Sequence, residues 1–206
     1  MLQPKIIHKE TFALLQSLSS CEELKIFSLA GGTALALQLG HRISIDLDFF
    51  TNERFNSQEV FEFLREHFIV SNCTYTANSL SLYIQSQQEE IKVDLIRHNY
   101  PRLRPIQTFK HIQIFSLEDI AAMKLNAIAN RGSKKDFYDI HALLKHFSIK
   151  ELISFFEEKD QQLNSYTVVK SLVYFVDADA EPEPISLGKT TWNEIKTDLR
   201  AVILTL

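Results

Sequence analysis

The chain has 206 residues and a formal net charge of −4, and 45% of its residues are hydrophobic and 23% are charged. This composition is that of a folded globular protein. It excludes disordered and fibrous proteins and argues against a protein that coats nucleic acid without specificity. Two cysteines without a CxxC pair argue against a zinc site or a disulfide framework. The sequence shows neither a signal peptide nor an apolar run of about 18 residues, so we expect a cytoplasmic protein that contacts no membrane.

Hydrophobic periodicity divides the sequence into a mixed part and a helical part. The mixed part is expected to contain, in order, a helix over residues 9–20, a strand over 25–30, a helix over 33–40, a strand over 43–50, a helix over 58–68 that Ser57 caps, and strands over 72–77, 80–85 and 91–98 with turns at 78–79 and 86–90. The helical part is expected to contain helices near 117–131, 134–147, 150–160, 165–176 and 189–203. We therefore predict an α+β fold, in which an α/β-type core with a mixed sheet, residues 1–110, precedes a C-terminal helical domain, residues 111–206.

The strand predicted over 25–30 stops at two glycines and a threonine, Gly31, Gly32 and Thr33. A glycine pair at the start of a helix lets backbone N–H groups approach a phosphate closely, and a hydroxyl can add a further contact. Thr33 is also expected near the N-cap of that helix. By itself the glycine pair is weak support for a phosphate site, because most such pairs only permit a tight turn.

Two aspartates, Asp46 and Asp48, interrupt the next strand, whose other face carries Ile45. Side chains at i and i+2 of a strand share one face and lie about 6.5–7 Å apart along the chain. A third carboxylate, Asp94, interrupts a later strand, IKVDLI, in the same way. Three acids on neighbouring strands suit a hard cation such as Mg²⁺, and two such ions about 4 Å apart would hold the attacking and leaving oxygens of a phosphoryl transfer. The alternative is that the acid pair faces water on an edge strand.

Several basic residues are candidates for contacting an anion. Lys124 falls on the apolar face of the helix predicted over 117–131, where a lysine either snorkels to the helix edge or meets an anion. Arg131 shares that face, and its alternative role is a favourable charge at the C-terminal end of the helix. His41 and Arg42 precede the acidic strand, where they could contact substrate.

The residues that start the helix predicted over 134–147 favour structural roles. Ser133 and Asp136 fit a weak capping box. Lys135 and Asp139 are spaced to pair at i, i+4 on the helix. From the residues alone, both aspartates are therefore expected to be structural.

The spacing of the glycine pair and the acid pair resembles the signature of the DNA polymerase β-like nucleotidyltransferase superfamily, in which a hydrophobic residue, Gly-Gly or Gly-Ser, and roughly a dozen residues precede Asp-hydrophobic-Asp. GGTALALQLGHRISIDLDFF (31–50) is similar to the first motif region of the AbiEii/AbiGii toxin family of nucleotidyltransferases. SLEDIAAMKLNAIANRGSKKDFYDIHALL (116–144) is similar to the second, a helix with a Lys, then an Arg and a Lys-Asp-x-x-Asp element.

The resemblance implies transfer of a nucleotide from an NTP, with Asp46 and Asp48 binding two Mg²⁺ or Mn²⁺ ions and Asp94 completing the second site. It implies that Lys124 neutralises the departing pyrophosphate. It also implies a toxin that adds nucleotides to RNA, at the acceptor end of tRNA, and a cognate antitoxin. The residues that it places at the nucleotide are Gly31, Gly32, Thr33, Arg131, Lys135 and Asp136.

Three rival hypotheses stay open at this point. In the first hypothesis, the acceptor of the nucleotide is a protein or a small molecule. The segment 95–135, with eight basic and two acidic residues, is also compatible with RNA as the acceptor. The second is a non-catalytic, nucleotide-binding member of the fold. The third is a glycosyltransferase with a DxD motif, which fits poorly because the motif comes too early in the chain for the usual nucleotide-sugar domain before it.

Overall fold

The computed structural model describes residues 2–87, 89–161 and 164–206, so residue 88 of the turn predicted over 86–90 lies outside the described residues. The chain divides into two compact units. We call the first the sheet unit; it consists of Met1–Gln38, Ser44–Pro101 and Ile106–Phe115. We call the second the helical unit; it consists of Leu39–Ile43, Arg102–Pro105 and Ser116–Leu206. Within the described residues, no helix is long and apolar enough to cross a membrane.

In the described part of the sheet unit, a seven-stranded mixed sheet has the strand order β3-β4-β5-β2-β1-β7-β6. β2 runs parallel to β5 and β1 parallel to β7, whereas the other neighbouring strands are antiparallel. The predicted α+β class with a mixed sheet is confirmed. The strands are β1 (Ser28–Ala30), β2 (Leu47–Thr51), β3 (Val70–Thr76), β4 (Ser79–Ser86), β5 (Glu89–Arg97), β6 (Gln107–Phe109) and β7 (Ile112–Ile114).

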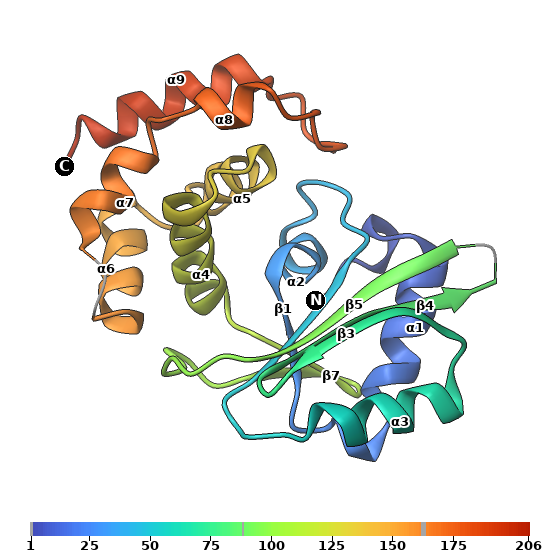
Figure 1. The fold of residues 1–206 in the computed structure, drawn as a ribbon. Helices are drawn as coiled ribbons and strands as arrows, with labels where there is room; N and C mark the ends of the chain where they lie inside the picture. The colour runs from blue at the N-terminus through green and yellow to red at the C-terminus, as the bar shows by residue number, and fades with distance from the viewer. Residues whose placement is uncertain (1, 88, 162–163) are drawn as a thin grey trace. The chain divides into compact units, whose positions relative to one another are not determined.

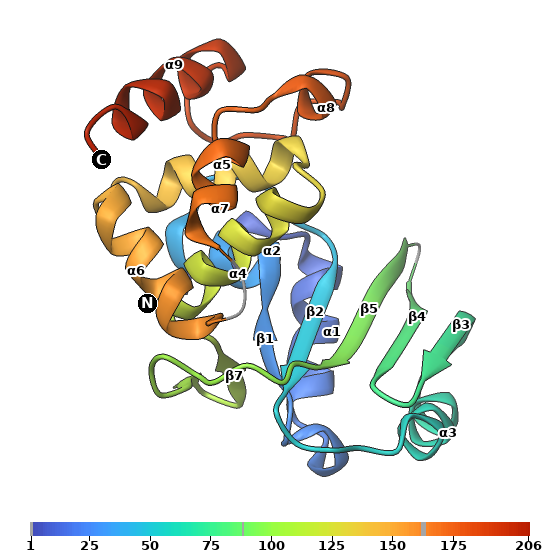
Figure 2. The same ribbon diagram turned by 60° about the vertical axis from the view of Figure 1, so that its left-hand side comes forward.

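The central strands alternate, and this gives the sheet one buried face. The inward residues include Leu47 and Phe49 of β2, Leu82 of β4, and Val93 and Leu95 of β5. Helix α1 (Lys9–Ser19) packs against β4 and β7, and helix α3 (Ser57–His67) packs against β3 and β4 (Figures 1 and 2). Because successive side chains of a strand point to opposite faces, the residues between these buried ones lie on the other face of the sheet.

Two elements around the acid pair begin at other residues than predicted. Helix α2 (Gly31–Leu39) starts at Gly31 rather than 33, so Thr33 lies inside the helix and the prediction that it is near the N-cap is wrong. Strand β2 starts at Leu47 rather than 43, and Ile45, predicted on the apolar face, is 53% exposed. The physical reason is that Leu39–Ile43 packs with the helical unit, so the chain joins the sheet only after this segment.

Three further features of the sheet unit differ from the predictions. Asn56, not Ser57, caps α3, because its side-chain oxygen accepts the N–H of Gln58 at 3.1 Å. β6 and β7 were not predicted, since three-residue strands give too little alternation to detect. β7 pairs with β1 through Leu29 and Ile114, which brings the end of the sheet unit to Phe115 rather than residue 110.

The helical unit is built around helix α4. α4 packs against α5, α6 and α7, and α5 packs against α8 and α9 (Figure 1). One helix was predicted over 165–176, whereas α7 ends at Ser171 and a separate short helix, α8, begins only at Val176. The helices are α4 (Leu117–Asn130), α5 (Lys134–Leu143), α6 (Ile149–Lys159), α7 (Ser165–Ser171), α8 (Val176–Asp179) and α9 (Trp192–Ile203).

Asp119 binds the loop at residues 102–105 to the rest of the helical unit. Its carboxylate accepts the backbone N–H groups of Leu103 at 2.9 Å and Arg104 at 3.1 Å. The buried ammonium of Lys159 lies 2.6 Å from the same carboxylate. Burial alone would raise the pKa of Asp119, but the hydrogen bonds and charge of Lys159 outweigh it and lower that pKa. This cluster explains why residues 102–105 belong to the helical unit and not to the core predicted over 1–110.

Candidate functional site

The register of the sheet brings the three predicted carboxylates onto one face. β2 and β5 pair Leu47 with Val93 and Asp48 with Asp94. Asp46 directly precedes Leu47 and shares the face of Asp48, because alternate residues of an extended chain point the same way. The structure thus places a predicted acidic cluster, Asp46, Asp48 and Asp94, on the two central parallel strands of the sheet unit, and all three residues are partly exposed.

The carboxylate of Asp48 packs directly against the backbone of Gly31. Gly31 has φ +65°, a left-handed conformation that favours glycine. A Cβ atom at this position would overlap Oδ2 of Asp48. Glycine is therefore required at position 31 both by the backbone conformation and by the lack of room for a Cβ atom. The glycine turn and the acid pair are in direct contact.

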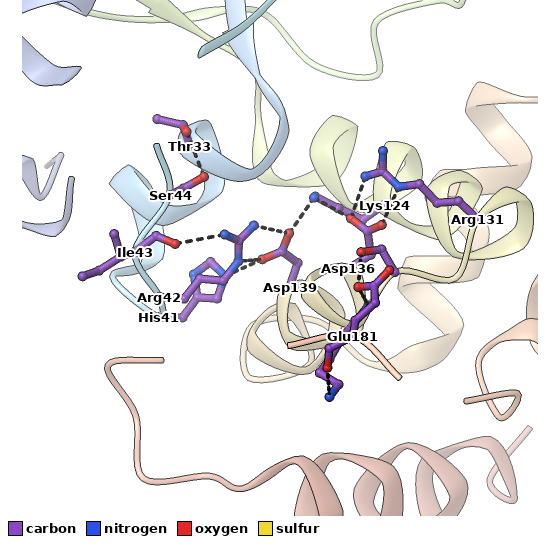
Figure 3. A network of polar contacts seen from close by, with 12 residues as sticks. Thr33, His41, Arg42, Ile43, Ser44, Lys124, Arg131, Asp136, Asp139 and Glu181 are labelled. Atoms are coloured by element: carbon purple, nitrogen blue, oxygen red, sulfur yellow. Dashed lines mark hydrogen bonds and ion pairs between the residues drawn. The ribbon is translucent and has the colours of Figure 1, made fainter. Parts of the chain in front are cut away.

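The hydroxyl of Thr33 is used inside the sheet unit. Thr33 is fully buried, and its Oγ1 hydrogen-bonds the main-chain oxygen of Asp46 and lies 2.9 Å from the hydroxyl of Ser44 (Figure 3). The side chain therefore ties α2 to the segment before β2. The predicted contact of Gly31, Gly32 and Thr33 with phosphate stays a prediction.

Asp94 has two side-chain partners that the sequence reasoning missed. Ser81 on β4, its cross-strand neighbour, donates a hydrogen bond to Oδ1 at 2.5 Å. Lys92 on β5 places its ammonium 2.6 Å from Oδ2. The hydrogen bond with Asp94 raises the pKa of Lys92, and the charges of Asp94, Asp46 and Asp48 add to it against a smaller opposing effect of burial. The spacing Lys-x-Asp in IKVDLI could have revealed this pair, because residues i and i+2 of a strand share a face.

The oxygen ligands of the acidic cluster are of the kind that Mg²⁺ prefers. Asp46 and Asp48 carry such oxygens next to the glycine turn, and the two oxygens of Asp94 accept hydrogen bonds from Ser81 and Lys92. Among the described residues, no group of three or more His, Cys, Asp or Glu side chains is arranged to hold a metal ion. The predicted metal contacts of Asp46, Asp48 and Asp94 therefore stay predictions.

The second sequence motif builds a buried ion-pair network in the helical unit (Figure 3). The ammonium of Lys124 lies 2.8 Å from Asp136 Oδ1 and 2.6 Å from Asp139 Oδ2. Lys124 falls on the apolar face of α4 as predicted, and its side chain is only 6% exposed. Its position is thus explained by two carboxylates of α5, and its predicted contact with pyrophosphate stays a prediction.

The same network holds the segment between α2 and β2. Arg42 forms a bidentate pair with Asp139, with Nε 2.7 Å from Oδ1 and Nη2 3.0 Å from Oδ2. Nε2 of His41 lies 2.7 Å from Asp139 Oδ1. The prediction that Asp139 pairs with Lys135 at i, i+4 is therefore wrong, because three groups from elsewhere occupy its carboxylate, Arg42, His41 and Lys124.

Arg131, Asp136 and Lys135 take different positions around this network. Arg131 places Nε 2.9 Å from Asp136 Oδ2, and its side chain is otherwise largely exposed. Lys135 is exposed on α5. The capping box predicted for Ser133 and Asp136 is wrong, because the Ser133 hydroxyl donates to Glu181. The predicted roles of Arg131, Lys135 and Asp136 at the nucleotide stay predictions.

Opposite charges inside the network shift the pKa values of Asp139, Asp136 and Lys124. Burial by itself would raise the pKa of Asp139, but the charges of Lys124 and Arg42 outweigh burial and hold that pKa well below its ordinary value. The pKa of Asp136 is lowered in the same way by Lys124 and Arg131. Burial would lower the pKa of Lys124, and the two carboxylates raise it instead. Lys124, Asp136 and Asp139 are therefore charged at neutral pH.

These pKa directions predict how stability depends on pH. A carboxyl group whose pKa is lower in the folded state stabilises fully above its unfolded pKa, about 3.9 for aspartate, and loses that contribution as the pH falls toward the folded value. We expect the urea midpoint of unfolding to be flat between about pH 5 and 8 and to fall steadily below about pH 4. A midpoint that stays unchanged down to pH 2.5 would contradict the assignment.

The fold and the acidic cluster behind a glycine turn define a nucleotidyltransferase-type fold. The crystal structure of a candidate nucleotidyltransferase from H. pylori aligns with a TM-score of 0.61 at 18% identity, over 96% of this chain and 95% of that chain. MenT4, a nucleotidyltransferase toxin from Mycobacterium tuberculosis H37Rv, aligns with a TM-score of 0.50 at 15% identity, over 97% of this chain and 86% of that chain. At these identities the likeness shows the fold.

The sequence itself identifies the family. Residues 13–202 match the family described as nucleotidyl transferase AbiEii toxin, type IV toxin–antitoxin system. The chain belongs to this family, which confirms the resemblance seen in the sequence. An uncharacterised protein of Aquifex aeolicus (strain VF5) is 38% identical over 179 residues, which is 84% of each chain.

Proposed function

We propose that this protein transfers a nucleoside monophosphate from an NTP to a hydroxyl group of RNA, at the acceptor end of tRNA, in a reaction that depends on Mg²⁺. One observation carries the proposal. Asp48 and Asp94 are register partners on the central parallel strands, Asp46 lies two residues before Asp48 on the same face, and Asp48 packs against Gly31 at the start of a helix. Membership of a nucleotidyl transferase family supports the class of reaction.

Each group of the sheet unit has a defined part in this chemistry. Asp46 and Asp48 would hold the cation, which lowers the negative charge around the α-phosphate. The backbone N–H groups at the N-terminal end of α2 would donate hydrogen bonds to the phosphates of the NTP, because the N-terminus of a helix favours anions. The acceptor hydroxyl oxygen forms a bond to the α-phosphorus, the bond from that phosphorus to the bridging oxygen of pyrophosphate breaks, and the hydroxyl proton passes to a carboxylate oxygen of Asp94. Catalysis consists mainly of positioning and electrostatic stabilisation.

The choice of RNA as acceptor rests on charge and on the family. The segment 95–135 holds eight basic and two acidic residues in a chain whose net charge is negative. Lys124 and Lys134 are buried, but Arg102, Lys110 and Lys135 are exposed, and exposed Lys and Arg side chains bind phosphate backbones. A toxin family also implies a cognate antitoxin as a partner in the cell.

Labelled nucleotides test the proposal directly. The purified protein is incubated with each of the four α-labelled NTPs and MgCl₂, either with total tRNA or with a tRNA-depleted protein lysate. We expect label in tRNA with at least one NTP. We expect EDTA to abolish this label, because without the cation nothing offsets the repulsion between the carboxylates and the phosphates. Label in protein alone would overturn the choice of tRNA, and an absence of label from every fraction would favour a non-catalytic member of the fold.

A further inference from the structure

A partly exposed tyrosine lies beside the acidic cluster on the same face of the sheet. Tyr83 alternates with the buried residues of β4, so its ring lies on the opposite face from theirs. It is the register partner of Lys92 on β5, and Ser81, two residues before it, is the partner of Asp94. Among the described residues of β4 and β5, Tyr83 alone is aromatic. This face therefore offers one aromatic ring next to the carboxylates.

The order of the strands places the glycine turn and Tyr83 on opposite sides of the acidic cluster. β4, β5, β2 and β1 lie side by side in this order (Figure 2). Asp48 on β2 pairs with Asp94 on β5 on one side and with Ala30, the residue before Gly31, on the other. Neighbouring strands lie about 4.7–4.9 Å apart, so β1 and β4 are about 14 Å apart. The acidic cluster thus lies between the start of α2 and Tyr83.

The geometry of phosphoryl transfer fixes the side from which the acceptor approaches. The attacking and leaving oxygens lie roughly in line, on opposite sides of the phosphorus. In the proposed function the phosphates of the NTP bind at the start of α2, so pyrophosphate leaves on the side of β1. The acceptor hydroxyl then reaches the phosphorus from the side of β5 and β4, where Asp94 would receive its proton. The nucleotide that carries this hydroxyl would lie over Ser81 and Tyr83.

Lys92 adds a positive charge next to the ring. Its ammonium contacts Oδ2 of Asp94 at 2.6 Å, and its side chain is 37% exposed. An ammonium has three N–H donors, so the contact with Asp94 leaves donors for a phosphate. Directly opposite residues of an antiparallel pair have Cβ atoms about 4.5–5.5 Å apart, which places this charge beside Tyr83. A ring and a cation side by side suit the base and the phosphate of a nucleotide.

We propose that Tyr83 stacks against the base of the terminal, unpaired nucleotide of the acceptor RNA and that Lys92 binds a phosphate of the same strand. This inference rests on the proposed function, because it names the acceptor subsite of the same reaction. Stacking on an aromatic ring uses the π-face that every base has, and it requires a base that is not paired within a helix. The acceptor is therefore an RNA with a single-stranded end, and this contact selects little among the four bases.

RNA binding without NTP tests the role of Tyr83 apart from transfer. A short, fluorescently labelled single-stranded RNA with a free 3′-hydroxyl is titrated with the protein in MgCl₂, and Kd is measured by fluorescence anisotropy. Tyr83→Ala should raise Kd about 5- to 150-fold, the range for the loss of one base–aromatic stack, whereas Tyr83→Phe keeps the ring and should bind as the wild type does. Tyr75→Ala is the matched control and should change nothing. Tyr75 is also exposed, but it pairs with the buried Leu80 and its ring stacks on Phe61 of α3, on the other face of the sheet.

An RNA that lacks only its 3′-terminal base tests the same contact without changing the protein. The wild type should bind this RNA more weakly by the same factor, and Tyr83→Ala should bind both RNAs equally, because the contact is already lost. Equal binding of both RNAs by the wild type would overturn the inference. So would an RNA affinity of Tyr83→Ala equal to that of the wild type at an unchanged melting temperature. A rise in the KM of Tyr83→Ala for NTP alone would assign the ring to the base of the NTP and would overturn it as well.

The salt dependence of the same binding tests Lys92. Loss of one phosphate contact on a single strand lowers the slope of log Kd against log salt concentration by about 0.7. We expect this change in Lys92→Met but not in Lys92→Arg, which keeps the charge, nor in Lys25→Met, whose lysine pairs with Glu22 away from the cluster. An unchanged slope in Lys92→Met would contradict the role of Lys92. Label in tRNA is scored separately, so transfer of label without these effects on binding would leave the proposed function standing and overturn the inference.

Discussion

Replacing Asp48 with asparagine is expected to lower nucleotidyl transfer roughly 10³-fold, because in the proposed mechanism Asp48 holds the cation, and such a ligand contributes several kcal/mol to stabilising charge in the transition state. Asp48 lies on β2 beside Asp94 and against Gly31. Its amide analogue has nearly the same shape and lacks the charge, so the fold should be kept. The measurement is the initial rate of label transfer at saturating MgCl₂, together with the melting temperature.

The same carboxylate can be displaced without changing it. In Gly31→Ala, the added methyl group would overlap Oδ2 of Asp48, and a misplacement of about 1 Å can cost about 10²-fold in rate. Gly132→Ala is the matched control, because Gly132 also has a positive φ, +58°, but a Cβ there would meet its nearest neighbour, the main-chain oxygen of Ile128, only at 3.8 Å.

Both glycine variants carry similar backbone strain, and Gly31→Ala adds the overlap with Asp48. Its stability should therefore fall at least as much as that of Gly132→Ala, and only Gly31→Ala should lose activity when rates are compared per folded protein. Equal activities of the two variants would show that the close approach of Gly31 to Asp48 has no part in the reaction. An active Asp48→Asn protein would remove the acidic cluster from the mechanism altogether.

Replacing Asp139 with asparagine is expected to lower the free energy of unfolding by about 3–5 kcal/mol, because removing one partner of a buried ion pair leaves its charges uncompensated. Asp139 is fully buried and meets Arg42, His41 and Lys124. Urea unfolding at pH 7, followed by circular dichroism, measures the loss. The loss should be smaller in the Lys124→Met background, since the two side chains share one interaction.

Asp198→Asn is the matched control for this prediction. Asp198 pairs with His141 in the same unit at 2.9 Å, but its side chain is 58% exposed. Exposed ion pairs contribute about 0–1 kcal/mol, so this variant should unfold almost as the wild type does. If Asp139→Asn is equally mild, the network does not hold the helical unit together.

The helices and most strands of this protein could be predicted because their signals are local. Periodicity located α1, α4, α6 and β4 to within a few residues, since a helix or an alternating strand records its buried face in its own sequence. The family could be named from motifs, because Gly31, Asp46, Asp48 and Asp94 keep a spacing that this chemistry requires. Features that depend on a residue far away in the sequence were missed. The capping box predicted for Ser133 is one example, because the hydroxyl of Ser133 instead donates to the distant Glu181.

The sequence by itself determined the α+β class, the family and the three carboxylates of the acidic cluster. Only the tertiary structure decided what surrounds them. The register of β2 and β5 placed Asp48 beside Asp94 and brought Lys92 into the cluster, and the buried network joined Lys124 to Asp139 and Arg42. Charged side chains choose their partners by distance in space, and a buried charge must find one, so residues far apart in the chain settle which ion pairs form.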